Sequence, residues 1–536
     1  MRYLNAQLAG VSPTPASLAV LEALEDGGLE AWFVGGWVRD ALRGAPSHDI
    51  DLCCSGTWQE SAAAISAVGI QVLETGTRFG GITAKIGTER IEITAYRVDG
   101  FYTDGRHPDG IASAQTIEED LARRDFTVNA IAWHPHRKIL DPFGGQADLA
   151  AGLIRAVGDP TRRFREDALR ILRAVRFACR LGFVVEEKTA AALALAAPLL
   201  SAIPYERIGT ELDATLLTGR AGPAMLVYPE VFCAAIPELS VCRGFDQRSP
   251  YHRFDVYDHT AYVLSWASQT MVRTDRKGEH IPVAVTELND ERSGTSGAPR
   301  DVLSDGSRPN RGVGAGQTSE GEYARASAAC QTPLTEQVRT QPHLLKPSRS
   351  LLWAALLHDI AKPETFTIDE EGRGHFFSHP ERGAVLARQI MNRLSLPSRL
   401  ISDVALLVHY HDMPLKPCRS SILDMLGRLT KKSSDAPRLM GELLDLKVAD
   451  ARGKTAECAD YVDEISKMRR LYERLLEQGS AYSVKTLALT GSDLISAGIA
   501  PGPQVGELLN RALELHIDGE VPNDAIALLK ALQLGL

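Results

Sequence analysis

The chain has 536 residues and a formal net charge of −9 at pH 7, with 44 % hydrophobic and 24 % charged residues. This length predicts three or four domains, and the composition is typical of a globular protein with buried cores. No apolar run follows a basic start, and no apolar stretch is long enough to span a bilayer, so we expect a cytoplasmic protein without a signal peptide or membrane span. The eight cysteines show no zinc-site spacing and are expected to be free thiols.

A helix over 15–28 is expected to lead into the first strand. There a short apolar run is followed by a double glycine, the start of a helix with Arg39, and then Asp49-Ile50-Asp51 in β-prone surroundings. Because side chains alternate along a strand, Asp49 and Asp51 should point the same way. Paired carboxylates suit Mg²⁺, which also binds substrate phosphates. The double glycine and the helix start let backbone N–H groups approach a phosphate, so we expect Gly36 and Arg39 there. The pattern predicts a metal-dependent nucleotidyl-transfer site.

The rest of the first 150 residues alternates between helical and β-prone segments. Thr57 is expected to cap a helix that runs to about Val68. Short β-prone runs follow at 70–74, 81–86 and 90–98, which predicts a compact mixed α/β head over 1–150.

The run GGWVRDALRG with HDIDL resembles the signature of the tRNA nucleotidyltransferase and poly(A) polymerase family, in the class that includes bacterial CCA-adding enzymes. This resemblance implies a nucleotidyltransferase head with a mixed sheet and a polymerase-β-like palm, in which Asp49 and Asp51 hold Mg²⁺. It also implies that Glu92, in the strand IEITAYR, is a third catalytic carboxylate. The loop 99–113, with Arg106 and Asp109, has the length expected of enzymes that also add the terminal adenosine.

Residues 118–133 (EEDLARRDFTVNAIAW) place a charged cluster before an apolar run that we expect to be helical. The stretch matches the family motif RRD-F-T-x-N-A. The resemblance implies that Arg124 contacts the nucleotide and that Asp125 lies near its sugar.

Residues 165–180 are expected to form one amphipathic helix with an arginine-rich polar face. Asp167 accepts hydrogen bonds and Arg170 donates them, and both cytosine and adenine present an amino donor beside a ring-nitrogen acceptor. This pair can therefore select C and A without a template, while U and G leave buried groups unpaired. The family's EDxxRxxR motif is present, which implies that Arg173 and Arg176 also bind the nucleotide. The helical neck is expected over 151–245, with 204–212 resembling a motif that fixes this helix.

A second constellation lies in the C-terminal half. The order H…HD…D resembles the HD superfamily of metal-dependent phosphohydrolases, which implies a site for one or two divalent ions at His259, His358, Asp359 and Asp450. His379, His409 and His411 fall where binuclear members place extra ligands. We expect this HD domain over 246–455, interrupted by a disordered insertion at 270–348 that is poor in aromatic residues.

The segment 456–536 is expected to be a helical, tRNA-binding tail, with a helix that begins at Pro503. It resembles the tail of bacterial CCA-adding enzymes.

Together these features predict template-independent addition of CCA to the 3′ end of tRNA from CTP and ATP. Two alternatives stay open: an A-adding enzyme or poly(A) polymerase on the same scaffold, and an HD phosphohydrolase acting on RNA 2′,3′-cyclic phosphates or on nucleotides. The sequence does not predict an oligomeric state.

Overall fold

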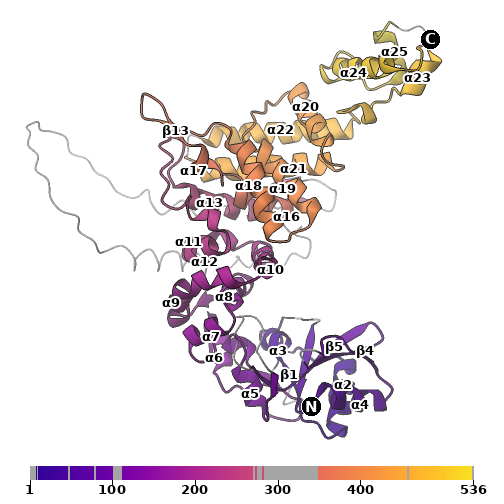
Figure 1. Ribbon diagram of the computed structural model, residues 1–536. Helices are drawn as coiled ribbons and strands as arrows, with labels where there is room; N and C mark the ends of the chain where they lie inside the picture. Colours follow the sequence, from indigo (N-terminus) through magenta and orange to yellow (C-terminus); the bar gives the residue numbers. More distant parts are fainter. Residues whose placement is uncertain are drawn as a thin grey trace, which may run out of the picture.

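The chain extends from a head at one end, through a helical neck and an HD region, to a small tail at the other end (Figure 1). The expected loop residues Arg106 and Asp109 and most of the expected insertion lie outside the described residues. The computed structural model describes residues 8, 10–45, 47, 49–77, 80–99, 111–269, 272–274, 280–282, 348–455 and 458–533.

The head is a mixed α/β unit, as predicted. Its elements are α2 (Pro15–Asp26), β1 (Ala31–Val34), α3 (Gly35–Leu42), β2 (Ile50–Cys54), α4 (Trp58–Ala67), β3 (Gln71–Leu73), β4 (Gly81–Ile86), β5 (Glu89–Ala95), β6 (Arg97–Asp99), β7 (Ile111–Ser113), α5 (Ile117–Ala122), η3 (Thr127–Asn129), β8 (Ala132–Trp133) and α6 (Gly145–Ala151).

A six-stranded sheet with the order β3-β4-β5-β2-β1-β8 organises the head. Strands β2 and β5 run parallel, and the other neighbours in the sheet are antiparallel. Phe33 and Leu52 form one register pair and face a core shared with α2 and α4. The next pair, Trp32 and Cys53, faces a second core on the opposite side. This alternation buries both faces of the central strands.

The neck is mainly helical and packs as one continuous core with the HD region. Its two-residue strands β9 and β10 pair in parallel. The elements are β9 (Leu153–Ile154), α7 (Pro160–Glu166), α8 (Leu169–Leu181), β10 (Val184–Val185), α9 (Glu187–Ala196), η4 (Ala197–Ala202), α10 (Tyr205–Leu216), α11 (Ala221–Val227), α12 (Pro229–Ala235) and η5 (Pro237–Leu239).

The HD region is a helical bundle with two short hairpins. One hairpin, β11–β12, lies within the expected insertion, and the other, β13–β14, projects from the helices (Figure 1). The elements are α13 (Val256–Gln269), β11 (Val272–Thr274), β12 (His280–Pro282), α16 (Arg349–Leu357), α17 (Lys362–Thr365), β13 (Thr367–Ile368), β14 (Gly374–His375), α18 (His379–Arg393), α19 (Ser398–Tyr410), α20 (Arg419–Thr430) and α21 (Ala436–Gly453).

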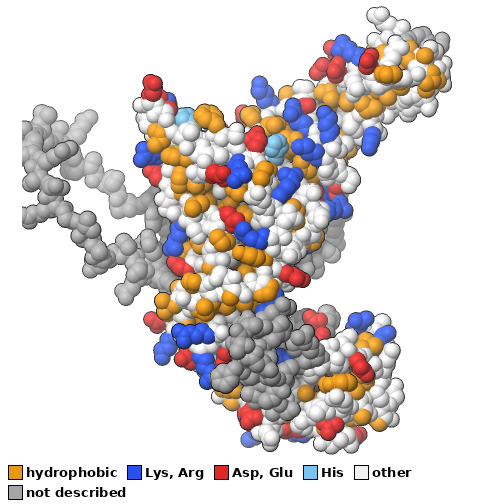
Figure 2. All heavy atoms as spheres, in the orientation of Figure 1, with side chains coloured by type: hydrophobic (Ala, Val, Ile, Leu, Met, Phe, Trp, Pro, Cys, Tyr) orange, Lys and Arg blue, Asp and Glu red, His pale blue; other side chains and the backbone are white. Residues whose placement is uncertain are grey.

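The last segment holds a small separate core that begins at Ala481. Helix α22, expected in the tail, instead contributes Ile465 and Met468 to the core of the HD region. Arg428 in the last turn of helix α20 and the following Lys431 and Lys432 are exposed. Figure 2 shows basic side chains gathered near the junction with the tail. The elements are α22 (Ala459–Glu477), η7 (Val484–Thr486), α23 (Gly491–Ser496), α24 (Pro503–Ile517) and α25 (Ala525–Ala531).

Two local predictions are wrong. The apolar run after Asp125 is not a helix: it forms the turn η3 and the strand β8, because Val34 and Phe33 pair with Ala132 and Trp133 across the sheet. The helix expected over 165–180 is interrupted at Asp167, whose backbone is extended (φ −145°, ψ 104°). The Asp167 carboxylate accepts the Leu169 N–H at 3.0 Å, so it starts a new helix instead of continuing the old one.

Candidate active site in the head and metal site in the HD region

The sheet pairs two of the three predicted carboxylates, and the third directly precedes one of the paired strands. Asp51 and Glu92 are register partners on the parallel strands β2 and β5, and Asp49 precedes β2 by one residue. Burial, followed by the nearby charges of Glu92 and Asp49, raises the pKa of Asp51 to about 6, although Arg124 opposes the shift. Three oxygen-donor groups that repel one another in this way fit a hard divalent cation, which would neutralise them.

The first turn of α3 contacts this cluster through a glycine. Gly35 has a φ of +72°, and a Cβ added there would lie 3.1 Å from Arg124 Nη1 and 3.3 Å from Asp51 Oδ2. Only a glycine allows the backbone, the guanidinium and the carboxylate to approach so closely. At Gly36 an added Cβ would make an ordinary contact, 3.6 Å from Arg39 Nη2.

Arg39 is buried and already engaged. Its Nε and Nη2 donate to Asp40 at 2.9 and 2.8 Å, and its Nη1 donates to Asn129 Oδ1 at 2.7 Å. The guanidinium also lies over the ring of Phe177 on α8. Arg39 therefore links the head to the neck, and its expected contact with phosphates stays a prediction.

Asp125 continues this link. Asn129 Nδ2 donates to Asp125 Oδ1 at 3.0 Å, and Arg173 Nε donates to Asp125 Oδ2 at 2.9 Å. Although burial acts in the opposite direction, Arg173 and Asn129 lower the pKa of Asp125 to about 2. The carboxylate is thus charged at neutral pH and holds α8 against the head.

Arg173 and Arg176 share a partner on α10. Arg176 Nε donates to Glu211 Oε2 at 2.6 Å, and Arg173 Nη1 lies 3.7 Å from Glu211 Oε1. The side chains from Arg39 through Asn129, Asp125 and Arg173 to Glu211 therefore form one continuous polar network. We name it the head–neck network.

The backbone N–H of Arg170 donates to the carbonyl oxygen of Asp167 at 3.0 Å, while the side chains of this expected base-reading pair also have other partners. Asp167 accepts from Arg207 Nη2 of α10 at 2.9 Å. Arg170 Nη1 donates to Glu166 Oε2 at 2.9 Å, and its Nη2 donates to the carbonyl oxygen of Arg123 at 3.0 Å. Arg207 lies in the segment 204–212, which was expected to fix the nucleotide-reading helix. The sequence did not indicate that Arg207 contacts Asp167, and the fold shows this contact.

In the HD region, Asp359 lies between two pairs of imidazoles. Its Oδ2 is 3.5 Å from His259 Nε2 and 3.2 Å from His358 Nε2. Its Oδ1 is 3.5 Å from His379 Nε2 and 3.6 Å from His411 Nε2. Within the described residues, these form two overlapping groups of three ligand atoms with Asp359 in common. All five side chains are buried.

The four imidazoles are oriented by their other nitrogens. The Nδ1 atoms face backbone carbonyl oxygens, at 3.3 Å for His259 with Gly453, 3.0 Å for His358 with Ala355, 2.8 Å for His379 with Phe376 and 2.7 Å for His411 with Val408. Such second contacts fix the tautomer in which Nε2 is free to bind a metal. Burial lowers the pKa of His379 to about 4, so its ring is neutral, as a ligand must be.

Asp450, the remaining predicted ligand, belongs to α21, and its Oδ1 lies 3.1 Å from His259 Nε2. The predicted set His259, His358, Asp359 and Asp450 is thus brought together by the fold. His409 lies outside both groups of ligand atoms and packs on Tyr410.

Three lysines border this cluster, and sequence reasoning missed them. Lys362 Nζ lies 2.8 Å from Asp359 Oδ2, and Lys454 Nζ lies 2.7 Å from Asp450 Oδ2. Lys447 Nζ donates to the carbonyl oxygens of His411 and Met413 at 2.6 and 2.8 Å. Lys362 follows Asp359 by three residues, and Lys454 follows Asp450 by four. This helical spacing could have indicated that each lysine lies beside its aspartate.

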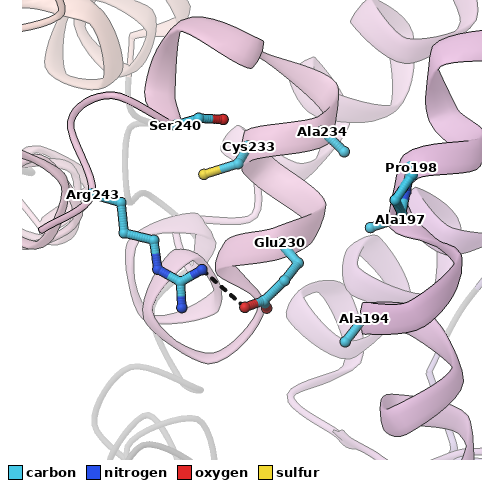
Figure 3. Close-up of a pocket in the computed structure, with 8 residues that line it drawn as sticks. All are labelled: Ala194, Ala197, Pro198, Glu230, Cys233, Ala234, Ser240 and Arg243. Carbon is cyan, nitrogen blue, oxygen red and sulfur yellow. Dashed lines mark hydrogen bonds and ion pairs between the residues drawn. The ribbon is translucent and has the colours of Figure 1, made fainter.

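A separate hollow of about 310 Å³ lies in the neck, lined mainly by small side chains of α9, η4 and α12. Figure 3 shows that Glu230 and Arg243, two of its lining residues, point toward one another, and Arg243 Nη1 lies 2.9 Å from Glu230 Oε1. Burial raises the pKa of the nearby Cys233 thiol, which disfavours a reactive thiolate. We assign no chemistry to this hollow.

Comparison with known proteins identifies families over four segments. Residues 31–155 match the poly A polymerase head domain, 182–240 the RNA and SrmB-binding site of polymerase A, 339–463 the HD domain, and 446–532 tRNA nucleotidyltransferase domain 2.

Curated relatives match part of the chain. The CCA-adding enzyme of Lactobacillus helveticus is 46 % identical over 195 residues, which cover 36 % of this chain and 48 % of that protein. The CCA-adding enzyme of Pediococcus pentosaceus is 39 % identical over 231 residues, 43 % of this chain and 56 % of that protein. The chain spans about half the length of the curated relatives that it matches.

Solved structures match along the whole chain. A Bacillus stearothermophilus CCA-adding enzyme in complex with CTP superposes with a TM-score of 0.58 at 22 % identity, covering 97 % of this chain and 98 % of the other. A Thermotoga maritima CCA-adding enzyme complexed with tRNA gives a TM-score of 0.55 at 19 % identity, covering 99 % and 98 %. At such identities the likeness shows the fold.

Fold and sites therefore define a chain with a poly A polymerase head, a helical neck and an HD domain. The matched segments include a poly A polymerase head domain, an HD domain and tRNA nucleotidyltransferase domain 2, in agreement with the resemblance that the motifs indicated. Among the described residues, no helix is both long enough and apolar enough to cross a membrane.

Proposed function

We propose that this protein adds CCA to the 3′ end of tRNA, using CTP and ATP and no nucleic-acid template. The head–neck network is the observation that carries the proposal. It connects Arg39, three residues after the glycine turn beside Asp51, to Arg173 on α8. The carboxylate cluster and the segment expected to choose the base are thus held as one unit. Relatives described as CCA-adding enzymes support the same reading.

The residues would divide the reaction between them. Asp49 and Asp51, with Glu92 beside them, would hold Mg²⁺, which when bound lowers the pKa of an attacking hydroxyl and neutralises phosphate charge. Gly35 and Gly36 leave the backbone of the first turn of α3 open to phosphates, and Arg124 adds a positive charge near Asp51.

Base choice falls to the α7–α8 junction. In this proposal Asp167 accepts the amino hydrogen of C or A, while an arginine donates to the ring nitrogen. Arg170 is the expected donor, and Arg207, which contacts Asp167, holds the carboxylate in place. Arg173 and Arg176 would hold the nucleotide from the same helix. A cytoplasmic location, with tRNA as the partner, is part of the proposal.

Three tRNA transcripts test this function: one that lacks CCA, one that ends after the second C, and one that is complete. We expect two C residues and then one A on the first, one A on the second, and nothing on the third. Asp49→Ala and Glu92→Ala should abolish incorporation. Glu89→Ala is the matched control, because residues 89 and 92 of β5 point to opposite faces. Addition of A alone, or of long A tracts, would instead support an A-adding enzyme or a poly(A) polymerase.

The imidazole and carboxylate cluster favours a second function, a metal-dependent phosphohydrolase centre. Two groups of ligands that share Asp359 fit two divalent ions, which when bound activate water for attack on a phosphoester. The purified chain should hydrolyse a nucleoside 2′,3′-cyclic phosphate when supplied with Mn²⁺, Ni²⁺ or Mg²⁺. His358→Ala should remove bound metal and hydrolysis, whereas the neighbouring control His409→Ala should keep both. Retention of hydrolysis in His358→Ala would exclude this centre.

A further inference from the structure

An aromatic rim borders the HD cavity. The cavity has a volume of about 260 Å³, and its lining includes the ligand-type residues Asp359, His379 and His411 together with His375, Phe376 and Phe377. Phe377 is 72 % exposed, although an exposed phenyl ring loses the free energy that burial would provide. The ring therefore lies at the mouth of the cavity that contains the metal-type ligands.

The rim is held in place by the same residues that hold the ligands. The carbonyl oxygen of Phe376 accepts from His379 Nδ1 at 2.8 Å, and the Phe376 ring packs on Phe366. Between Phe377 and His379 lies Ser378, with a φ of +61°, a left-handed conformation that few non-glycine residues adopt. The tight turn places Phe377 outside and His379 inside, two residues apart.

Phe377 forms a stack with His375. The two rings lie 5.3 Å apart between centroids with an interplanar angle of 6°. The His375 ring is fixed in turn, because its Nε2 lies 2.8 Å from Asp369 Oδ2 within the β13–β14 hairpin. A flat, preorganised aromatic surface of this kind is suited to stacking against another planar ring.

The size of the cavity indicates which part of a substrate it encloses. Its volume is below the roughly 300–1,000 Å³ typical of pockets that bury a whole ligand. A phosphoester and its sugar could lie inside, beside the ligands and the two lysines Lys362 and Lys454, while an attached base would extend to the rim. Stacking tolerates every base, because each has a π face.

We propose that Phe377, supported by His375, is the base-stacking surface of the HD centre, which therefore takes nucleotide phosphoesters without reading the identity of the base. This inference rests on the proposed phosphohydrolase function. Under this proposal the two sites differ in base selectivity: the head distinguishes C and A from U and G, and the HD centre does not.

Uridine 3′-monophosphate is the binding probe, because the head is expected to reject uracil. Its affinity is measured by equilibrium dialysis without added metal, for the wild-type chain, Phe377→Ala and the control Ile368→Ala, an exposed position on the same hairpin. Phe377→Ala should bind about fivefold or more weakly, the lower end of the loss expected for removing a stacking ring. Ile368→Ala should bind like the wild type, and guanosine 3′-monophosphate, whose base the head is also expected to reject, should show the same loss as the uridine probe.

Turnover with Mn²⁺ adds a second readout, using uridine 2′,3′-cyclic phosphate and the base-free methyl riboside 2′,3′-cyclic phosphate. Phe377→Ala should raise KM for the uridine substrate with kcat unchanged and leave the base-free substrate unaffected.

Equal losses on both substrates would mean a structural role and overturn the proposal, as would unchanged binding of the uridine probe. A change of sedimentation coefficient in Phe377→Ala with unchanged nucleotide binding would identify a contact between copies instead. If the wild type hydrolyses neither substrate, the phosphohydrolase function fails, and the dialysis still decides the stacking.

Discussion

Arg207 Nη2 lies 2.9 Å from Asp167 Oδ2, and Arg207 Nη1 lies 3.5 Å from the other oxygen, so the carboxylate expected to read the base is held by both arms of a guanidinium. The two residues are 40 positions apart, on α10 and at the α7–α8 junction. A bidentate contact of this kind fixes direction as well as distance. Arg207 is therefore a positioning residue for Asp167.

Substitution of Arg207 tests that role. Without it, the Asp167 carboxylate can rotate, and its preference for an amino donor weakens. We expect Arg207→Ala to lower the ratio of kcat/KM for CTP over UTP about tenfold, since a hydrogen bond to a charged group contributes about 1.5–3 kcal/mol. Arg165→Ala, an exposed arginine on α7, is the control. A fall in kcat/KM for both nucleotides by the same factor would show that Arg207 supports folding and not selection.

Asp49 and Asp51, most strands of the head and the helix that begins at Pro503 could be predicted from the sequence, because those features follow from local alternation, capping and proline preferences. Glu92 was predicted only through the resemblance of its strand to the family. The sequence did not locate the interruption at Asp167, because an aspartate is compatible with a helix until its side chain takes a backbone N–H. The partners Arg207 and Glu211, and the strand at Ala132, depend on contacts between distant segments. Local periodicity carries no information about such contacts, and the same holds for the rim at Phe377.

Gly35 offers a test of the contact between backbone and site. Alanine at Gly35 would adopt a left-handed backbone at a cost of roughly 1–2 kcal/mol. It would also place a methyl group 3.1 Å from Arg124 Nη1 and 3.3 Å from Asp51 Oδ2. We expect Gly35→Ala to reduce kcat for CMP incorporation by more than tenfold, because both groups must move.

Gly28→Ala is the control that introduces the same backbone strain as Gly35→Ala without displacing Arg124 or Asp51. Gly28 has a φ of +82°, and a Cβ there meets no atom within 4 Å. It should lower the unfolding temperature like Gly35→Ala while keeping near-normal incorporation. Comparable activity in the two variants would show that the approach of Gly35 to Asp51 is not needed for the reaction.

Metal use by the head should depend on pH through Asp51. Its pKa is raised, chiefly by burial, to about 6, so in the metal-free chain the carboxyl is ionised above pH 6 and becomes protonated as the pH falls through 6. A metal ion must then displace that proton, and at pH 5 the apparent affinity should be about tenfold lower than the limit at high pH.

The measurement is the Mg²⁺ concentration that gives half-maximal incorporation at pH 5, 6 and 7.5. His358→Ala should show the same shift, because the HD ligands are a separate set. If the half-maximal Mg²⁺ concentration is the same at pH 7.5 and pH 5, Asp51 is not a ligand that must lose a proton before the ion binds.

Lys447 is expected to control the second half of the HD cluster. Its ammonium is buried and donates to the carbonyl oxygens of His411 and Met413. Each hydrogen bond from a charged donor contributes about 1.5–3 kcal/mol, so Lys447→Met should loosen the turn that carries His411. Elemental analysis after dialysis at limiting Mn²⁺ should find about one ion fewer per chain than in the wild type, with His259 and His358 still able to hold the other. Lys485→Met, at an exposed lysine of the tail, should retain the full metal content. Equal metal content in Lys447→Met and the wild type would show that His411 is positioned without the lysine.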